Sequence, residues 1–256
     1  MTRTRSQKIR LDHLLVDRGL VESREKAQGL ILAGLIMVDE QKQEKCGALV
    51  TSGAAVRLLG EPPKYVSRGG LKLEGALEHF RINPDAKVCL DVGASTGGFT
   101  DCLLQHGAGK VFAIDGGTNQ LAWKLRRDPR VVVLEKTNAR YLTFDRIGTL
   151  AELVTVDVSF ISATLILPAL VRLLASPADL VVLVKPQFEV GKGQVGKGGI
   201  VRDPAQHQEA VAKVSRKLLE LGFYELSSME SSLLGAKGNR EFFLHAVWKR
   251  DLGFRF

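Results

Sequence analysis

The feature that most constrains the fold is an alternation of short apolar strands and amphipathic helices from residue 70 onward. Mostly apolar, strand-like runs occur at 87–91, 111–114, 131–134, 153–156 and 180–184. Helical spacing of apolar residues occurs at 70–80, 98–105, 120–126, 161–174 and 206–221. A strand that is apolar on both sides must be buried on both faces, so this pattern predicts an α/β fold with a parallel sheet between layers of helices. Two later runs, 224–227 and 241–248, would complete a seven-stranded, mostly parallel sheet.

A small α+β unit is predicted in front of this region. A helix containing Leu11, Leu14 and Leu15 on one face should end at Gly19, and Ser23 should cap a second helix over 24–32. Short strands are expected at 36–38 and 55–58. The predicted organisation is a small domain at 1–59, a linker with two prolines at 60–67, and a larger domain at 68–256.

The charge of the chain favours a polyanionic partner. The formal net charge is +8, and basic residues are frequent near the N-terminus and on the second predicted helix. Lysine and arginine side chains at these positions are expected to neutralise phosphates of RNA, although they could also form a solvated face. The candidates in the small domain are Arg3, Arg5, Lys8, Arg10, Arg24 and Lys26.

The cysteines and the apolar segments indicate a cytoplasmic protein. Cys46, Cys89 and Cys102 form neither a CxxC pair nor a zinc spacing, so we expect a reducing setting and no metal site. The first ten residues lead into no apolar signal segment. The most apolar stretch, 153–184, is interrupted by charged residues and prolines, whereas a membrane-spanning helix needs about 20 uninterrupted apolar residues.

A glycine-rich turn follows the first strand of the larger domain. It reads Asp91-Val92-Gly93-Ala94-Ser95-Thr96-Gly97-Gly98, and Asp115 ends the next strand. Such a turn lets a ligand reach backbone N–H groups, and a strand-end carboxylate can accept both hydroxyls of a ribose. The alternative is a tight strand–helix turn with a structural acid. The spacing is not GxGxxG, and Asp91 would repel a pyrophosphate, which favours a cationic, phosphate-free cofactor over a dinucleotide.

Two ionisable residues follow later strands directly. Asp157 ends the strand 153–156 and Lys185 ends the strand 180–184, so parallel strands should bring both to the edge that carries the glycine turn. A strand-end lysine can instead be a surface residue whose stem packs on apolar neighbours. The segment 191–198 nearly fits the P-loop pattern, but Gly198 replaces the required hydroxyl residue. We therefore expect a basic, glycine-rich loop there, one that could close over RNA.

These motifs together resemble a known family of RNA methyltransferases. Residues 8–59 resemble the small RNA-binding domain first known from ribosomal protein S4, through Arg10-Leu11-Asp12, Gly19-Leu20, Ser23-Arg24, Ala27, Ile31, Gly34 and Val38. Residues 65–256 resemble FtsJ-like methyltransferases. The combination resembles the TlyA family through Val66-Ser67-Arg68-Gly69, the turn 91–98, Asp157-Val158-Ser159-Phe160-Ile161-Ser162 and Lys185-Pro186-Gln187-Phe188-Glu189.

The resemblance implies an enzyme that methylates a ribose 2′-hydroxyl on cytidines of ribosomal RNA. It implies a catalytic tetrad, which falls on Lys72, Asp157, Lys185 and Glu241, and a further RNA contact at Arg68. It also implies the cofactor S-adenosylmethionine, with contacts from Asp91, Gly93, Ala94, Ser95, Thr96, Gly97, Asp115, Asn138, Ala139 and Asp157. One departure is Asp115-Gly116-Gly117-Thr118-Asn119, where many relatives carry Asp-Val-Gly-Tyr-Gly.

The resemblance also bears on the substrate. Members that act on both ribosomal subunits tend to carry a further C-terminal helix. This sequence ends at Phe256, soon after its last predicted strand, which favours large-subunit RNA as the partner. The sequence does not indicate an oligomeric state.

Three other interpretations remain. The family carries an old haemolysin label, but a pore former would need a membrane-inserting segment, which the sequence does not show. An RNA-binding protein without activity is disfavoured because all four tetrad positions are intact. A pseudouridine synthase would share the S4-like domain, but it would leave the glycine turn at 93–98 without a purpose.

Overall fold

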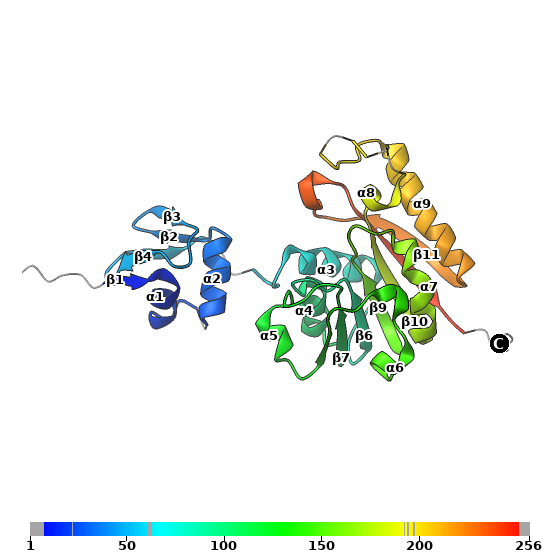
Figure 1. Ribbon diagram of the computed structural model, residues 1–256, viewed down its shortest axis with the longest axis horizontal. Coiled ribbons are helices and arrows are strands. Elements are labelled where there is room, and N and C mark those ends of the chain that lie inside the picture. The colour runs from blue at the N-terminus through cyan, green and yellow to red at the C-terminus, as the bar shows by residue number, and fades with distance from the viewer. Residues whose placement is uncertain are drawn as a thin grey trace, which may run out of the picture. The chain divides into compact units, whose positions relative to one another are not determined.

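The computed structural model describes residues 8–250 except 22, 61–62, 192, 194 and 197, and the chain divides into two compact units (Figure 1). The units are Met1–Pro63 and Lys64–Phe256, so the division falls inside the predicted linker. Arg3 and Arg5, two of the predicted RNA-binding residues, lie outside the described residues. The same holds for Lys192, Gln194 and Lys197 of the glycine-rich loop.

In its described residues the small unit contains two helices and two small sheets. The helices are α1 (Leu11–Asp17) and α2 (Arg24–Leu32), and Ser23 caps α2 as predicted by accepting a hydrogen bond from the Lys26 N–H. The strands are β1 (Lys8–Arg10) paired with β4 (Leu49–Thr51), and β3 (Gln41–Gln43), β2 (Ile36–Val38) and β5 (Val56–Leu58) in one sheet. The core is formed by side chains such as Leu11, Leu15, Ile31 and Ile36, which are fully buried.

The larger unit is built on one seven-stranded sheet. Its strands are β6 (Val88–Val92), β7 (Lys110–Ile114), β8 (Val131–Leu134), β9 (Ala151–Val156), β10 (Leu174–Val184), β11 (Phe223–Glu230) and β12 (Phe242–Trp248). The order is β11-β12-β10-β9-β6-β7-β8, and β12 runs antiparallel to both of its neighbours. The predicted fold class is confirmed. The strand order reverses between β6 and β9, where open α/β sheets bind their ligands.

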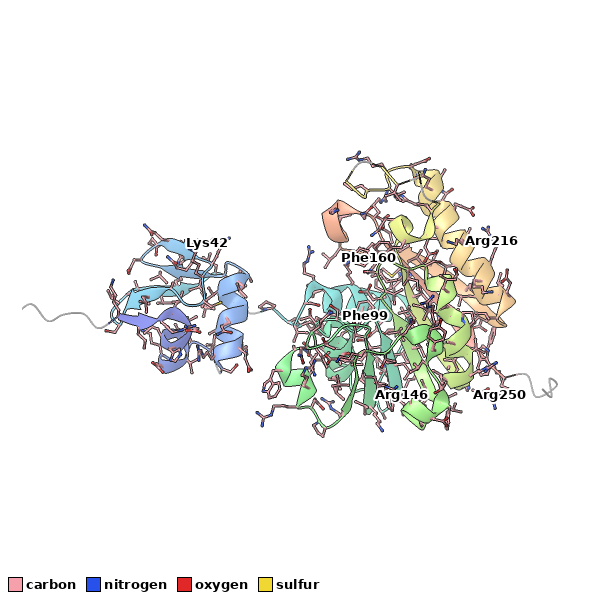
Figure 2. All side chains as sticks on the ribbon, in the orientation of Figure 1. Lys42, Phe99, Arg146, Phe160, Arg216 and Arg250 are labelled. Carbon is pink, nitrogen blue, oxygen red and sulfur yellow. The ribbon has the colours of Figure 1, made fainter. Side chains whose placement is uncertain are left out.

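Helices cover both faces of this sheet. One face packs against α3 (Arg68–Phe80), α4 (Gly98–Gln105) and α5 (Trp123–Arg126), and Phe99 of α4 lies in that cluster (Figure 2). The other face packs against α6 (Phe144–Ile147), α7 (Leu167–Leu170) and α9 (Pro204–Glu220). Val181 and Val182 of β10 belong to opposite clusters, because successive residues of a strand face opposite sides. This explains why the central strands are apolar over most of their length.

Short elements connect these layers. The helix α8 (Pro186–Glu189) follows β10 directly. Single turns of 3-10 helix are η1 (Ala139–Tyr141), η2 (Ala163–Leu165), η3 (Val171–Leu173) and η4 (Ala236–Gly238). No helix in the described part of the chain combines the length and the apolar character that crossing a membrane requires.

The predicted continuous helix over 161–174 is wrong. The structure instead has η2, α7 and η3 in succession, and Leu174 already begins β10, where it pairs with Ala151 of β9. Pro168 lies in the first turn of α7, where its missing N–H costs nothing. A proline farther into a helix would remove a backbone hydrogen bond and would disfavour helical geometry in the residue before it. The helical spacing of the apolar residues therefore reflects several short turns that bury the same face.

Candidate active site

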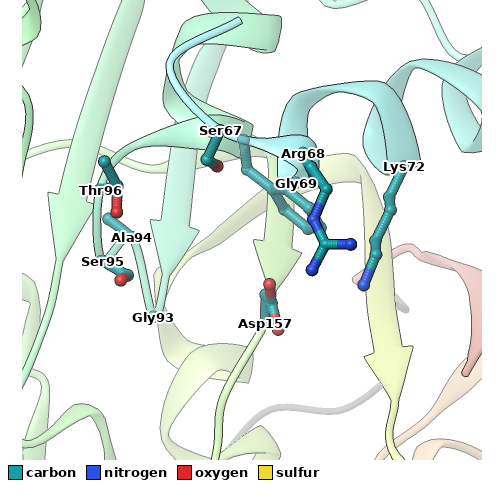
Figure 3. A pocket seen from close by; sticks show the side chains of 11 residues that line it. Ser67, Arg68, Gly69, Lys72, Gly93, Ala94, Ser95, Thr96 and Asp157 are labelled. Atoms are coloured by element: carbon teal, nitrogen blue, oxygen red, sulfur yellow. The ribbon is translucent and has the colours of Figure 1, made fainter. Parts of the chain in front are cut away.

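A pocket of about 240 Å³ lies at the carboxyl ends of β6 and β9, where the strand order reverses. It is lined by the start of α3, by the glycine turn after β6 and by the residue that follows β9. In Figure 3, Asp157 lies between the glycine turn and the side chains of Arg68 and Lys72. The lining residues are Ser67, Arg68, Gly69, Lys72, Gly93, Ala94, Ser95, Thr96, Gly98, Phe99 and Asp157.

The glycines of the turn are required by close approaches of the backbone. Gly93 has φ of +89°, and a Cβ there would lie 2.2 Å from the carbonyl oxygen of Asp157. Gly97 has φ of +96°, and a Cβ there would lie 2.3 Å from Leu125 Cδ1. Both the conformation and the space therefore exclude side chains. The turn is held directly against the backbone at the end of β9, which keeps Asp157 at the pocket.

Asp115 lies beside the turn and holds it through backbone N–H groups. The Ser95 N–H donates to Asp115 Oδ2 at 2.8 Å, and the Gly117 N–H donates to Oδ1 at 2.7 Å. A carboxylate has about four acceptor positions, so roughly two remain for other donors. The side chain is half-buried. Its remaining acceptor positions fit the predicted contact with two ribose hydroxyls.

Asn138 and Ala139 were also predicted near the cofactor, and like Gly97 and Asp115 they do not line the pocket. Asn138 is exposed, and its Oδ1 accepts the Arg140 N–H at 3.1 Å as the cap of η1, while Ala139 is buried. The Thr137 N–H donates to the Asp115 carbonyl at 2.9 Å, so this turn lies next to Asp115. Their contact with a cofactor stays a prediction.

Asp91 also lies away from the pocket lining and is fully buried beneath the turn. The Thr100 hydroxyl donates to Asp91 Oδ2 at 2.6 Å, and the Thr155 hydroxyl donates to Oδ1 at 3.2 Å. Both carboxylate oxygens are thus engaged by the protein itself. Burial raises the pKa of Asp91 to about 7, and the bond from Thr100 opposes this shift. Its position indicates support of the turn from below rather than direct contact with a ligand.

We expect Asp91→Asn to become more stable, relative to the wild type, as the pH rises. An unfolded Asp titrates near 3.8, so between pH 4 and 7 the folded state keeps a proton that the unfolded state has released. Stability therefore falls with rising pH across this window in the wild type but not in the variant, which cannot ionise. The free energy of unfolding of the variant minus that of the wild type should therefore rise by roughly 3 kcal/mol between pH 5 and pH 8. Thermal and urea unfolding at both pH values measure this, and parallel pH profiles would contradict it.

The four predicted catalytic residues form two acid–lysine pairs at this edge. Lys72 Nζ lies 2.6 Å from Glu241 Oε2, and their side chains are 12% and 2% exposed. The Lys185 ammonium contacts Asp157 Oδ1 as an ion pair without hydrogen-bond geometry, and it donates a hydrogen bond to Ser159 Oγ at 3.1 Å. Lys72 and Asp157 both line the pocket.

The position of Glu241 follows from the reversed direction of β12. Val184 pairs with Phe242, so Lys185 after β10 and Glu241 before β12 lie at the same edge of the sheet. The predicted strand 241–248 begins one residue later, at Phe242, which leaves Glu241 in the preceding loop. A Cβ on Gly235 would lie 1.9 Å from Glu241 Oε1, so that loop packs directly against the carboxylate.

One buried acid, to which the sequence analysis gave no role beyond its place in the motif 185–189, joins the loops that carry Asp157 and Lys185. Glu189 is buried at the end of α8, and its Oε1 accepts the Ala163 N–H at 2.7 Å. Its Oε2 accepts from the Ser162 hydroxyl and lies 3.2 Å from Lys213 Nζ of α9. The sequence does show this carboxylate among apolar residues. Its partner on α9 lies 24 residues away, so the local sequence does not reveal the contact.

The predicted RNA-binding residues of the small unit are partly paired with an acid. Arg10 Nη2 and Arg24 Nε lie 2.9 and 3.0 Å from Oδ2 of Asp12, which is fully buried. The Arg10 guanidinium holds the pKa of Asp12 well below its usual range. About half of each arginine side chain stays exposed, and Lys8 and Lys26 are exposed. Asp12 therefore orients the two arginines, and their contact with phosphates stays a prediction.

Arg68 belongs to the larger unit and lies at the rim of the pocket. It is exposed, and its guanidinium forms no ion pair or hydrogen bond with another described residue. This unpaired cation at a pocket rim is available to a phosphate of a bound strand.

Comparisons with known proteins agree with this geometry. Residues 65–248 match the model of the FtsJ-like methyltransferases, and residues 9–56 match that of the S4 domain. The 16S/23S rRNA (cytidine-2'-O)-methyltransferase TlyA of Mycobacterium tuberculosis is 50% identical over 240 residues, which cover 93% of this chain and 90% of that protein. Hemolysin A of Brachyspira hyodysenteriae is 42% identical over 93% of this chain and its own full length. A solved structure of a Streptococcus thermophilus protein that carries the hemolysin name has a TM-score of 0.73 and 42% identity, covering 96% of this chain and 90% of that one.

Proposed function

Because this chain belongs to the TlyA family of FtsJ-like methyltransferases, we propose that it transfers a methyl group from S-adenosylmethionine to a cytidine 2′-hydroxyl in ribosomal RNA. The observation that supports this most directly is the pair of acid–lysine contacts, Lys72–Glu241 and Lys185–Asp157, at the rim of a pocket beside the glycine turn. A binding module would not need two nearly buried lysines at a strand-end edge.

The residues at the pocket fit S-adenosylmethionine. Asp157 lines the pocket and suits a positively charged ligand, whereas it would repel a phosphate. Asp115 has acceptor positions left for ribose hydroxyls, and it fixes the backbone of Ser95 in the pocket lining. S-adenosylmethionine, when bound, supplies a methyl group that its cationic sulfur has already activated. The protein's tasks are then alignment of the acceptor and removal of one proton.

The lysines and acids divide these tasks. In this proposal Lys185 accepts the proton of the 2′-hydroxyl, since a ribose hydroxyl is a poor nucleophile until that proton leaves. Asp157 orients Lys185 through their ion pair. Glu241 orients Lys72, which lines the pocket and can donate hydrogen bonds to the substrate. Glu189 accepts the Ala163 N–H and pairs with Lys213, and these contacts fix the positions of the loops that carry Asp157 and Lys185 relative to each other.

The small unit supplies RNA affinity in this proposal. It matches the S4 domain, and Lys8, Arg10, Arg24 and Lys26 would contact phosphates without reading the sequence. Arg68 at the pocket rim would hold the strand next to the target. Large-subunit RNA is the substrate we favour, and a ribosomal substrate would place the enzyme in the cytoplasm.

The activity is tested by incubating the protein with labelled S-adenosylmethionine and either ribosomal subunit or its free RNA. Mass spectrometry of nuclease digests should show 2′-O-methylcytidine at a defined position. Label on a base instead of a ribose would refute the proposed chemistry. RNA binding without any label would favour the inactive binding protein.

Asp115→Ala is expected to weaken S-adenosylmethionine binding roughly 10- to 100-fold. The change removes the acceptor for the ribose hydroxyls and also frees the N–H groups of Ser95 and Gly117, and hydrogen bonds to a charged group are worth about 1.5–3 kcal/mol. Asp115→Asn keeps one acceptor oxygen and should lose less. Titration calorimetry measures both affinities, and an unchanged affinity of the alanine variant would remove Asp115 from the site.

A further inference from the structure

A second cavity, of about 390 Å³, is built on the same two loops that carry Asp157 and Lys185. Its walls include Phe160, Ile161, Ser162 and Leu165, which follow Asp157, and Gln187 and Phe188, which follow Lys185. It shares no lining residue with the pocket at the glycine turn. The Cα atoms of Lys185 and Gln187 are at most about 7.6 Å apart, because they are separated by two peptide units. Lys185, the proposed proton acceptor, is therefore close in the chain to the residues that line the second cavity.

Two phenylalanines give this cavity an aromatic wall. The ring centroids of Phe160 and Phe188 lie 5.3 Å apart, and the rings are inclined by 50°. Phe160 is 92% exposed and has φ of +64°, a conformation that bulky residues rarely adopt (Figure 2). The surrounding structure must hold this strained residue in place, and strained residues concentrate where ligands bind. An aromatic wall in this position suits a flat ring.

The polar group on the wall is the amide of Gln187. Its Oε1 is buried and accepts no hydrogen bond from the described residues, and the amide as a whole has no partner among them. The hydroxyl of Ser162, which also lines the cavity, is already engaged by Glu189. A buried carbonyl oxygen without a donor is unfavourable, so a ligand that offers a donor to Oε1 and an acceptor to Nε2 would complete the amide.

We infer that this cavity receives the base of the nucleotide whose ribose is methylated, and that Gln187 hydrogen-bonds to its Watson–Crick edge. The inference rests on the proposed function. Cytosine presents its N4 amino donor next to its N3 acceptor, which complement Oε1 and Nε2 of an amide. Bases displaced from a stack are commonly held by aromatic side chains and by hydrogen bonds to this edge.

The Gln187 contact strengthens binding of a pyrimidine edge but does not distinguish cytosine from uracil. Uracil presents a donor and an acceptor in the reverse order, and no described residue fixes the orientation of the Gln187 amide. A half turn of the amide would therefore let it pair with uracil as well. The choice of cytidine must then come from the position of the target in the folded RNA.

The test compares Gln187→Met with the wild type on two RNAs. One carries cytidine at the methylated position and the other carries an abasic ribose there. Methionine has a similar length but cannot form the two hydrogen bonds, so kcat/KM on the cytidine RNA should fall roughly 10- to 100-fold. On the abasic RNA the variant and the wild type should be equal. Gln208→Met, on the exposed side of α9, is the matched control and should change neither rate.

The other outcomes contradict either the Gln187 contact, the binding of the base in this cavity, or the proposed function. An equal loss on both RNAs would show that Gln187 acts through the fold, and no loss on the cytidine RNA would show that it makes no contact; either result overturns the inference. If the wild type methylates both RNAs equally well, the target base does not bind in this cavity. If neither the wild type nor Gln208→Met methylates the cytidine RNA while both bind S-adenosylmethionine, the proposed function itself fails.

Discussion

Lys185→Arg is expected to lower the single-turnover rate of methyl transfer at least about 100-fold while RNA and S-adenosylmethionine still bind. The side chain is 12% exposed and contacts Asp157 and Ser159, both of which an arginine can also reach. A guanidinium keeps the positive charge but cannot act as a base, so the variant separates proton removal from electrostatic binding. If Lys185 only bound a phosphate, arginine would serve nearly as well.

The measurement is a single-turnover assay with enzyme in excess, combined with separate binding assays for RNA and cofactor. Lys217→Arg, in an exposed pair with Glu220 on α9, is the matched control and should keep the wild-type rate. Near-normal methylation by Lys185→Arg would disprove the base role. Alignment of the substrate would then be the main source of catalysis.

Glu241→Leu is expected to destabilise the larger unit by about 3–5 kcal/mol, because it leaves the nearly buried ammonium of Lys72 without its partner. Removal of both charges should be far less costly, since a buried ion pair is often replaceable by apolar residues. We therefore expect Lys72→Met/Glu241→Leu to recover most of the lost stability. Both variants should be inactive, because neither presents an oriented lysine to the pocket.

Urea unfolding of the single and double variants measures the stability, and the methylation assay measures the activity. Recovery of stability without recovery of activity would assign the pair a role in the reaction. If the single and the double variant are equally unstable, the ion pair does not explain the cost. A double variant with wild-type activity would remove Lys72 and Glu241 from the site.

The sheet could be predicted because burial on both faces leaves a plain pattern in the sequence. Val181 and Val182 face opposite cores, and such strands stand out between amphipathic helices. The region around Pro168 was predicted wrongly because several short turns can bury one face with the same spacing as a single helix. Strands of three residues, such as β1 and β3, are too short to show a period.

The site could be predicted where a residue directly follows a strand. Asp157 and Lys185 were placed at one edge on that ground, whereas Glu241 came from the family resemblance alone. The sequence does not reveal which way a strand-end acid points, so Asp91 was expected at the cofactor although Thr100 and Thr155 engage its carboxylate. Contacts between distant segments, such as that of Glu189 with Lys213, leave no local pattern.

The antiparallel direction of β12 has a practical consequence for handling the protein. Its first residue, Phe242, pairs with Val184 beside Lys185, and its last, Trp248, pairs with Ala178 towards the opposite end of β10. The chain thus passes the candidate active site before β12 and leaves the sheet at the opposite end of that strand. An affinity tag or a surface anchor joined after that strand would start on the side away from the candidate active site. Immobilised enzyme attached in this way should keep the candidate active site accessible.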